Sequence, residues 1–486
     1  MLLTGAFAYK IKRPVRYDFI DLVSAERRAF FCAEEVRLNR RFAPDLYLDL
    51  CDIRETPEGL RIGADTGTVI ERCVRMRQFP SERQLDRLLA ADAIQPATME
   101  AFGRELARIH ARLPVALPTE KWGDPSAIQQ AIERNLEEYV RAAAAFGQPL
   151  AGNELRKSLD AVCSSLATCM QSRRAAGRIR ECHGDMHARN IALLGAGLVA
   201  FDCIEFQPAF RWIDVGEEIA LLLADLASRE RPRHAHAFLS GYLGESGDYQ
   251  ACRVLPLYRA HRALVRAKVN ALQARDAADE QAVASSRRRH DRLLREAQAA
   301  LGRKSPRLIL MSGLSGSGKT WLATQLAPEL CAIHLRSDIE RKRRAGLDAG
   351  ASSNSPVGGG LYAEEGTGDL YAWLAQCAED ALAGGYDVIV DATFLKRSMR
   401  QTFEALAERL DVPLIVLLCE APLSVLRDRV RQRQRSASDA SEANTDVLEW
   451  QLREREPIDA AEGLSVVHID ATGENLLARA LESLRQ

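Results

Sequence analysis

The stretch GLSGSGKT, residues 313–320, constrains the fold of this chain more than any other segment. It matches the pattern GxxxxGK[ST], in which glycines let backbone N–H groups close around phosphate oxygens. An apolar strand-like run, RLILMSG, leads into it and a helical segment follows, so the start of that helix adds a positive end. We therefore expect a phosphate-binding loop between a buried strand and a helix. A chance glycine-rich turn is the alternative, but it leaves the flanking strand and helix unexplained.

Each position of this loop is expected to contact ATP or its metal ion. Lys319 would bridge the β- and γ-phosphates, and the Thr320 hydroxyl would ligate Mg²⁺. The other positions would offer backbone N–H groups to the phosphates. The expected ATP-binding residues are Gly313, Leu314, Ser315, Gly316, Ser317, Gly318, Lys319 and Thr320.

The segment around the loop is predicted to be an α/β domain with a parallel sheet. Apolar runs alternate there with helical stretches, which favours parallel strands joined by crossover helices. After the loop these runs lie at 331–336, 387–391, 413–419 and 465–470. A chain of 486 residues is too long for one ordinary core, so we expect two domains. The turn-rich GRKSP divides them into residues 1–303 and 304–486, and we expect flexible insertions at 349–368 and 436–445.

A second motif, HGDMHARN at residues 183–190, lies in the first half of the chain. Its spacing HxDxxxxN is that of a kinase catalytic loop, in which the Asp deprotonates the acceptor hydroxyl and the Asn holds Mg²⁺. Those roles fall on Asp185 and Asn190. A second Mg²⁺-binding Asp is required after the next strand, and Asp202 stands there, across a predicted hairpin. The alternatives are a zinc site at the two histidines, which lacks the HExxH glutamate, or a structural polar turn.

The form HGDxHxxN resembles the aminoglycoside phosphotransferase family, and choline and homoserine kinases share the broader pattern. The resemblance implies an α+β bilobal kinase-like fold for the first domain. It places Asp202 where protein kinases have their metal-binding Asp, with Glu205 as a second acid nearby. In RWIDVGEEIA it makes Asp214 the residue that braces the catalytic loop.

The same resemblance requires an ATP-anchoring lysine on an early strand and an acidic partner on the following helix. FAYK fits this pattern and gives Lys10, with Lys12 on the same strand face as the alternative. The helix supplies Glu35 as the partner, with Glu34 beside it. Only nine residues precede Lys10, so the family's first strand and its phosphate-covering loop are expected to be absent or very short.

The chain after residue 304 resembles the small P-loop kinases of the gluconate kinase and polynucleotide kinase type. In that family an Asp after the second strand accepts the proton of the acceptor hydroxyl, and a nearby Arg grips the acceptor. In RSDIERKR these roles fall on Asp338 and Arg341. Asp391, which ends the strand-like VIVD, is expected to hold Mg²⁺, and a strand-end cap is the alternative.

An arginine-rich stretch, RDRVRQRQR at 427–435, precedes one of the expected insertions. The resemblance makes it a lid whose Arg427 contacts ATP, whereas a solvated basic helix face is the alternative. Gln451 in WQLREREP resembles part of a Gln-and-acid segment that occurs late in gluconate kinases.

Composition excludes several classes of protein. The net charge of −1 gives no general attraction to nucleic acid or anionic membrane, so nucleic acid is not the expected partner. No apolar run reaches the roughly 18 residues that span a bilayer, and the N-terminus lacks the basic start of a secretory signal. The 11 cysteines include no CxxC pair, which is typical of reduced thiols in a cytoplasmic protein.

Together these features predict a two-domain ATP- and Mg²⁺-dependent phosphotransferase that acts on a hydroxyl of a small molecule. The alternatives are a regulatory protein with one inactive nucleotide-binding domain and a polynucleotide end kinase. Residues 253–296 carry an excess of Lys and Arg over acids, which disfavours a polycationic aminoglycoside and favours a neutral or anionic acceptor. Arginines that simply face solvent would explain the same excess. No motif of the sequence indicates an oligomeric state.

Overall fold

The computed structural model describes residues 1–17, 20–146, 152–275, 277, 279–302, 304–348, 351, 364–436 and 444–485. Its contacts divide the chain into two compact units. Unit 1 is Met1–Ser246 with Val254–Gly302, and unit 2 is Gly247–Arg253 with Arg303–Gln486. Most of the two expected insertions lies outside the described residues. Within them, no helix has the length and apolar character to span a bilayer.

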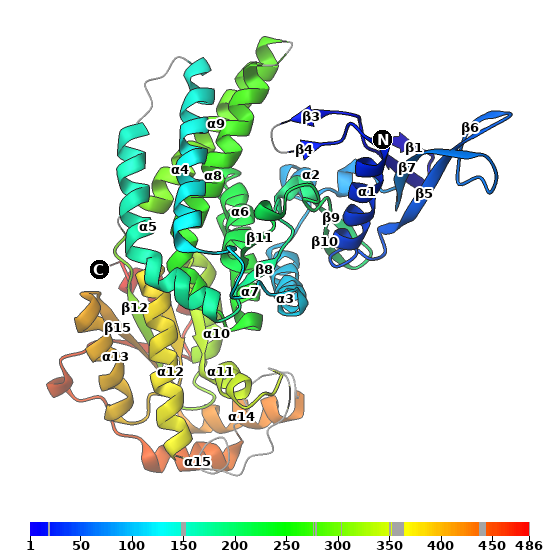
Figure 1. The fold of residues 1–486 in the computed structure, drawn as a ribbon. Helices are drawn as coiled ribbons and strands as arrows, with labels where there is room; N and C mark the ends of the chain where they lie inside the picture. Colours follow the sequence, from blue (N-terminus) through cyan, green and yellow to red (C-terminus); the bar gives the residue numbers. More distant parts are fainter. Residues whose placement is uncertain are drawn as a thin grey trace. The chain divides into compact units, whose positions relative to one another are not determined.

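Unit 1 begins with an antiparallel sheet in the order β1-β2-β7-β5-β6 (Figure 1). Its strands are β1 (Leu2–Leu3), β2 (Phe7–Ile11), β5 (Tyr47–Thr56), β6 (Gly59–Ile62) and β7 (Thr68–Arg77). A small hairpin, β3 (Arg16–Tyr17) with β4 (Ile20–Asp21), precedes helix α1 (Ala25–Asn39). The helix packs on β5 and β7. Ser24 caps its start by accepting a hydrogen bond from the Arg27 N–H.

The rest of unit 1 is mainly helical. Its helices are α2 (Leu85–Ala90), α3 (Pro96–Arg112), α4 (Pro125–Ala143), α5 (Gly152–Ala175), α6 (Val215–Ser228), α7 (Pro232–Ser246), α8 (Ala251–Arg275) and α9 (Glu280–Leu301). Two short strand pairs lie among them: β8 (Ile179–Glu181) with β11 (Trp212–Asp214), and β9 (Ile191–Leu194) with β10 (Gly197–Ala200). The second pair is the predicted hairpin. An antiparallel sheet followed by helices confirms the predicted α+β kinase-like fold.

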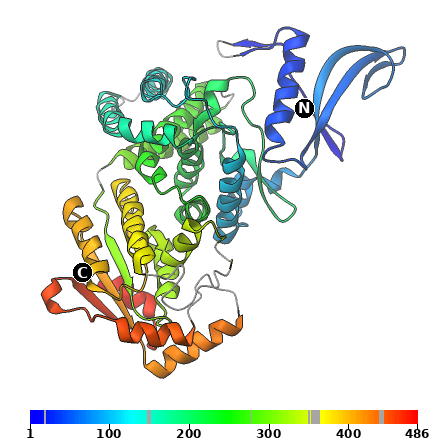
Figure 2. The same cartoon turned by 60° about the horizontal axis from the view of Figure 1, so that its bottom comes forward.

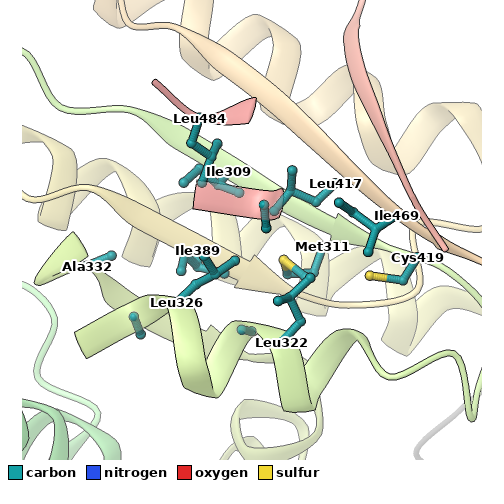
Figure 3. Packing of buried hydrophobic residues seen from close by; sticks show 13 residues of the cluster. Ile309, Met311, Leu322, Leu326, Ala332, Ile389, Leu417, Cys419, Ile469 and Leu484 are labelled. Atoms are coloured by element: carbon teal, nitrogen blue, oxygen red, sulfur yellow. The ribbon is translucent and has the colours of Figure 1, made fainter. Parts of the chain in front are cut away.

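Unit 2 contains a parallel sheet in the order β13-β14-β12-β15-β16, which confirms the predicted fold class (Figure 2). Its strands are β12 (Leu308–Ser312), β13 (Ile333–Arg336), β14 (Val388–Asp391), β15 (Leu414–Glu420) and β16 (Ser465–Asp470). Its helices are α10 (Lys319–Leu330), α11 (Ser337–Arg344), α12 (Glu364–Ala383), α13 (Arg397–Leu410), α14 (Leu423–Ser436), α15 (Thr445–Glu454) and α16 (Leu476–Ser483). Side chains such as Ile309 and Met311 of β12 pack against Leu322 and Leu326 of α10 (Figure 3). This core holds the phosphate-binding loop between β12 and α10.

A short segment, Gly247–Arg253, which ends in the first turn of α8, also belongs to unit 2. Tyr249 in this segment donates a hydrogen bond from its hydroxyl to the buried carboxylate of Glu340 in α11 (3.0 Å). Trp373 of α12 donates to the other oxygen of Glu340 (3.1 Å). Arg253 pairs with Asp380 of α12. The chain therefore contributes to unit 2 twice, once through this segment and once after α9.

Candidate active sites

The catalytic loop of unit 1 runs from β8 to the 3₁₀ turn η3 (Ala188–Asn190). Asn190 donates from Nδ2 to the Asp185 backbone oxygen (3.1 Å) and to its Oδ2 (3.3 Å). His187 Nδ1 accepts from the Arg189 N–H, so the ring proton is on Nε2, which lies 3.3 Å from Asp185 Oδ2. Burial alone would raise the pKa of Asp185. The hydrogen bond and charge of His187 lower it by more, so that the net pKa lies well below the usual range of an aspartate. Asp185 is therefore ionised, and its side chain is 36% exposed.

The histidines of this loop are structural. His183 Nε2 donates to the Phe201 backbone oxygen (2.8 Å), and its Nδ1 accepts from the Asp185 N–H (3.3 Å). Burial lowers the pKa of His183 to about 4, so the ring is neutral near pH 7. Because both nitrogens of His183 and of His187 are engaged, the structure does not support the zinc alternative. Gly184 lies between them at φ +89°, where a Cβ would stand 2.7 Å from the Phe210 oxygen.

Two acids of helix α6 hold the backbone of the loop. Glu218 accepts hydrogen bonds from the N–H groups of His183 (2.7 Å) and Gly184 (3.0 Å). Asp225 accepts one from the Ala188 N–H (2.9 Å). The expectation that Asp214 braces the loop was wrong.

Asp214 stabilises the start of α6. Its carboxylate forms two 2.7 Å hydrogen bonds with the fully buried guanidinium of Arg173 and caps the helix through the Gly216 N–H (2.7 Å). It is therefore a structural partner that fixes α6, whereas Glu218, one helical turn further on, touches the loop. The sequence did contain a signal for the role of Glu218: an acidic pair within the apolar run VGEEIALLLADLA. Acids buried in such a run need hydrogen-bond donors, which the backbone of the loop supplies.

The lysines of β2 share one glutamate of α1. Lys10 Nζ lies 2.7 Å from Glu35 Oε1 and 2.5 Å from Asp202 Oδ1. Lys12 Nζ lies 2.7 Å from Glu35 Oε2 and also pairs with Glu205. Burial lowers the pKa of Lys10, but Glu35 and Asp202 raise it more, so its amine stays charged. Lys10 is the lysine that joins the helix glutamate to Asp202, while Lys12 lies deeper.

Asp202 follows β10 in a left-handed backbone conformation, at φ +68°. Its N–H donates to the Tyr47 hydroxyl (3.1 Å), which holds the strained turn. Burial alone would raise the pKa of Asp202, but Lys10 lowers it by more, so the net pKa is lowered. The side chain of Asp202 is 45% exposed. Asn190 uses its amide nitrogen on Asp185, which leaves its oxygen free to face a cation. Carboxylate and amide oxygens are ligands that Mg²⁺ accepts, so this pair fits the expected ion.

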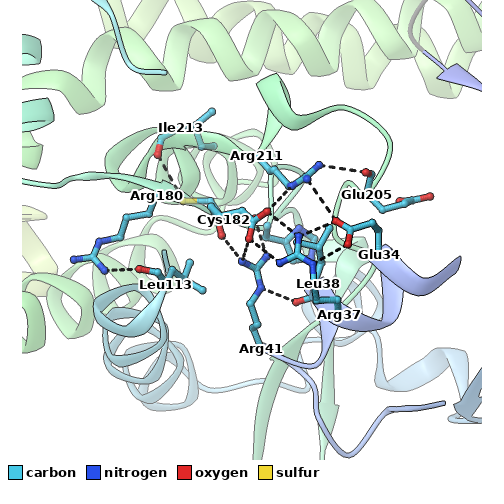
Figure 4. A network of polar contacts seen from close by, with 12 residues as sticks. Glu34, Arg37, Leu38, Arg41, Leu113, Arg180, Cys182, Glu205, Arg211 and Ile213 are labelled. Carbon is cyan, nitrogen blue, oxygen red and sulfur yellow. Dashed lines mark hydrogen bonds and ion pairs between the residues drawn. The ribbon is translucent and has the colours of Figure 1, made fainter. Parts of the chain in front are cut away.

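An arginine network fixes α1 to the base of the catalytic loop (Figure 4). Glu181, at the end of β8, accepts from Arg37 of α1 (2.9 and 3.0 Å) and from Arg41, two residues beyond the end of α1 (3.0 Å). Arg211 adds a third contact to Glu181 (3.1 Å). Since α1 also carries Glu35, the network positions the lysine partner relative to Asp185 and Asp202.

The phosphate-binding loop of unit 2 needs its glycines. Gly313, Gly316 and Gly318 have φ values of +143°, +85° and +84°. A Cβ on Gly313 would stand 2.5 Å from the Cys419 oxygen, and one on Gly316 would stand 2.8 Å from the Leu426 oxygen. Lys319 Nζ folds back to the Leu314 oxygen (3.5 Å). The Ser317 hydroxyl is buried without a hydrogen-bond partner among the described residues, which fits a loop shaped for a phosphate.

Asp391 lies at the end of β14, next to the start of α10. Its Oδ2 is 3.4 Å from His334 Nε2 of the neighbouring strand β13. Burial raises the pKa of Asp391, but His334, Lys319 and the Thr320 hydroxyl lower it more, so the carboxylate is ionised. A carboxylate next to the Thr320 hydroxyl is a donor set that Mg²⁺ accepts.

The acceptor side of unit 2 is formed by α11 and α12. Asp338 lies in the first turn of α11 and is partly buried. Arg341, on the same helix, donates to the Thr367 hydroxyl (3.5 Å). Both charges act on the buried Tyr371 of α12, whose pKa is raised mainly by burial. Tyr371 accepts from the Phe394 N–H (3.2 Å), just beyond Asp391.

One arginine of the arginine-rich stretch contacts the loop directly, and it is Arg429 rather than Arg427. Arg427 pairs with Glu449 of α15 (2.7 Å). Arg429, instead, donates to the Gly316 oxygen (3.3 Å) and the Ala471 oxygen (2.9 Å). Gln451 accepts from the Ser315 N–H (2.8 Å). The geometry places Arg429 and Gln451 at the phosphate-binding loop, whereas Arg427 lies against α15.

Two protein-family models match the chain. Residues 32–255 match the phosphotransferase enzyme family, and residues 308–458 match the family described as an AAA domain. The first range contains the loop of Asp185, and the second contains the loop of Lys319. The first half of the chain thus matches a phosphotransferase family, and the second half matches the AAA domain family, in two separate segments.

Several proteins are similar to the chain at low sequence identity. The uncharacterized protein Rv2004c of Mycobacterium tuberculosis (strain ATCC 25618 / H37Rv) is 28% identical over 446 residues, covering 91% of this chain and 86% of that protein. A sugar kinase structure from Janibacter sp. HTCC2649 is 23% identical and covers 37% of this chain and 95% of that one, with a TM-score of 0.29. A gluconokinase structure from Sinorhizobium meliloti 1021 is 21% identical, covers 38% and 94%, and has a TM-score of 0.27.

Proposed function

We propose that this protein is an ATP-dependent kinase with two nucleotide sites, each of which transfers the γ-phosphoryl group of ATP to a hydroxyl of a small molecule. Residues 1–303 would form the first kinase domain and residues 304–486 the second, with 247–253 packed into the second unit. The observation that carries the proposal is that each unit brings charged residues of its motif together. In unit 1, Lys10 lies within ion-pair distance of Glu35 and Asp202. In unit 2, Asp391 lies beside Lys319 and Thr320 of the glycine-rich loop.

In the first domain Asp185 accepts the proton of the acceptor hydroxyl. The hydroxyl oxygen forms the new bond to the γ-phosphorus, the bond from that phosphorus to the β–γ bridging oxygen breaks, and ADP leaves. Lys10, held by Glu35, binds the phosphates of ATP. Asn190 and Asp202 would hold Mg²⁺, which neutralises the charge that develops on the phosphates. His187 keeps Asp185 ionised and oriented.

In the second domain Asp338 is the proposed acceptor base and Arg341 the acceptor-binding residue. The loop from Gly313 to Thr320 would bind the phosphates of ATP. Thr320 and Asp391 would hold Mg²⁺. Contact with the Gly316 oxygen supports Arg429 as the lid arginine nearest the phosphates, in addition to the Arg427 expected from sequence.

A transfer assay with γ-labelled ATP tests the proposal in the full chain. A metabolite extract is incubated with wild type, with Asp185→Asn, with Lys319→Ala and with the double variant. Wild type should label products that divide into two sets, one lost with each single variant and both lost in the double variant. Labelling that survives in the double variant at the wild-type rate would contradict the assignment of both sites.

A further inference from the structure

Four arginines from four different elements gather beside the catalytic loop of unit 1. We call them the arginine cluster: Arg189 of η3, Arg229 at the end of α6, Arg266 of α8 and Arg289 of α9. Burial and the charges of the other three lower the pKa of Arg289. The other three guanidinium groups therefore lie within electrostatic reach of Arg289, although they are far apart from it in the sequence.

Hydrogen bonds fix the cluster to the helices on one side. Asn270, which is 5% exposed, donates from Nδ2 to the Arg266 oxygen (2.8 Å), one turn earlier on α8. Its Oδ1 accepts from Arg289 Nε (3.1 Å). This amide therefore joins the turn of α8 that carries Arg266 to the face of α9 that carries Arg289.

A second bridge fixes the cluster to the catalytic loop. Asp225 of α6 pairs with Arg229 Nε (3.1 Å) through one oxygen and accepts the Ala188 N–H (2.9 Å) through the other. Arg189 is the next residue after Ala188. Arg266 lies close enough to Asp185 for its charge to help lower the pKa of that carboxylate. The cluster thus borders the residue proposed to deprotonate the acceptor.

The charge of the cluster is largely uncompensated. Among the described residues, Asp225 is the only carboxylate that forms an ion pair with it, and Arg289 otherwise bonds to the neutral Asn270 and Ser286. Neighbouring cations on the same helices do have acidic partners. Those pairs are Arg259 with Glu296, Arg262 with Glu217 and Lys268 with Glu138. On α9, Arg288 and Arg295 also lack a carboxylate partner among the described residues. The cluster differs because Arg266 reaches Asp185 with its charge and because Arg229 shares Asp225 with the catalytic loop.

We propose that the arginine cluster binds a phosphate group of the acceptor, so that the first domain phosphorylates a hydroxyl of a phosphate ester. The inference rests on the function proposed above and names the substrate class of that site. Guanidinium groups match phosphate oxygens with two parallel hydrogen bonds, and several of them can share one dianion. A phosphate held by Arg266 and Arg289 would keep the remainder of the acceptor next to Asp185. A polycationic acceptor would meet like charges instead.

Binding of inorganic phosphate tests the subsite without any turnover. All proteins carry Lys319→Ala, and a non-hydrolysable ATP analogue with Mg²⁺ fills the nucleotide site of the first domain. Hydrogen exchange of peptides covering 183–190 and 262–292 is followed as phosphate is added. Phosphate should slow exchange in the background protein and in a control with Arg295→Gln, an exposed arginine of α9 outside the cluster. In the double variant Arg266→Gln/Arg289→Gln, the apparent affinity for phosphate, measured by this slowing of exchange, should be at least about ten-fold lower.

Equal phosphate responses in all variants, or none in the background protein, would overturn the subsite. Transfer from γ-labelled ATP to glycerol and glycerol 3-phosphate, and to ribose and ribose 5-phosphate, separates this result from the fate of the proposed function. Asp185-dependent transfer to neutral alcohols that ignores the arginine variants would keep the kinase and reject the subsite. Arginine-dependent phosphate binding without any Asp185-dependent transfer would keep the subsite and reject the kinase.

Discussion

Replacing Glu218 by Gln should change how the stability of unit 1 depends on pH. Glu218 is 1% exposed, and burial raises its pKa to about 7, although the N–H groups of Gly184 and His183 favour the charged form. In an unfolded chain a Glu titrates at about 4.3. The folded protein therefore binds this proton more tightly than the unfolded chain does.

The sign and size of the effect follow from linkage. The stabilisation from this proton is fully present below the unfolded pKa and is lost as the pH rises through the folded pKa. Between about pH 5 and pH 8 the loss from wild type amounts to about 2 to 3 kcal/mol, at 1.36 kcal/mol for each pKa unit. Gln does not titrate. The free energy of unfolding of Glu218→Gln, measured relative to wild type, should therefore rise by about 2 to 3 kcal/mol from pH 5 to pH 8. The other titrating groups are the same in both proteins, so their contributions cancel in this difference.

Urea unfolding followed by pulsed hydrogen exchange and mass spectrometry measures this quantity, because peptides of unit 1 report its unfolding separately from unit 2. A control, Glu105→Gln, changes an exposed residue of α3 and should alter the free energy of unfolding by less than about 0.5 kcal/mol at either pH. If the difference between Glu218→Gln and wild type stays constant or falls from pH 5 to pH 8, the reasoning is refuted.

Three further predictions concern the two sites. Lys319→Ala should nearly abolish ATP turnover at the second site while circular dichroism stays unchanged; normal turnover in an Asp185→Asn background would contradict this. Asp185→Asn should remove transfer by the first domain and leave its ATP affinity largely intact. Asp202→Asn should instead weaken Mg²⁺-dependent nucleotide binding. Calorimetric titration of ATP into both variants measures these affinities, and a loss of affinity in Asp185→Asn alone would contradict the assigned roles. Asp214→Asn should destabilise unit 1 by about 3 to 5 kcal/mol because it leaves the buried Arg173 charge without its partner, and urea unfolding that matches wild type would show the pair to be unimportant.

Local patterns predicted the parts of this protein that are encoded locally. The loop around Lys319, the strand before it and the hairpin before Asp202 each follow from a short run of sequence, because glycine conformation and strand alternation act over a few residues. The contacts that depend on which face of a helix is buried were harder to predict. Arg427 and Arg429 lie two positions apart on α14 and so point in different directions, and only packing decides which one meets the loop.

The bracing of the catalytic loop shows the same limit. Asp214 and Glu218 occur within one short acidic and apolar segment, and the sequence offers no reason to prefer one as the partner of His183 and Gly184. The choice depends on how α6 packs against the loop, which involves residues distant in the chain. The arginine cluster is the extreme case, since its members come from four elements that only the tertiary fold brings together.

The hydrogen bond from Tyr249 to Glu340 has a consequence for the modularity of the chain. A P-loop half cut free at residue 304 would lose Tyr249 and Arg253, and the helix that carries Asp338 would lose a buried contact. The second half could therefore not be exchanged at a single junction. Residues 247–253 form part of its fold although they lie within the first half of the sequence. A separable second half would need the segment 247–253 to be added back, for instance by circular permutation.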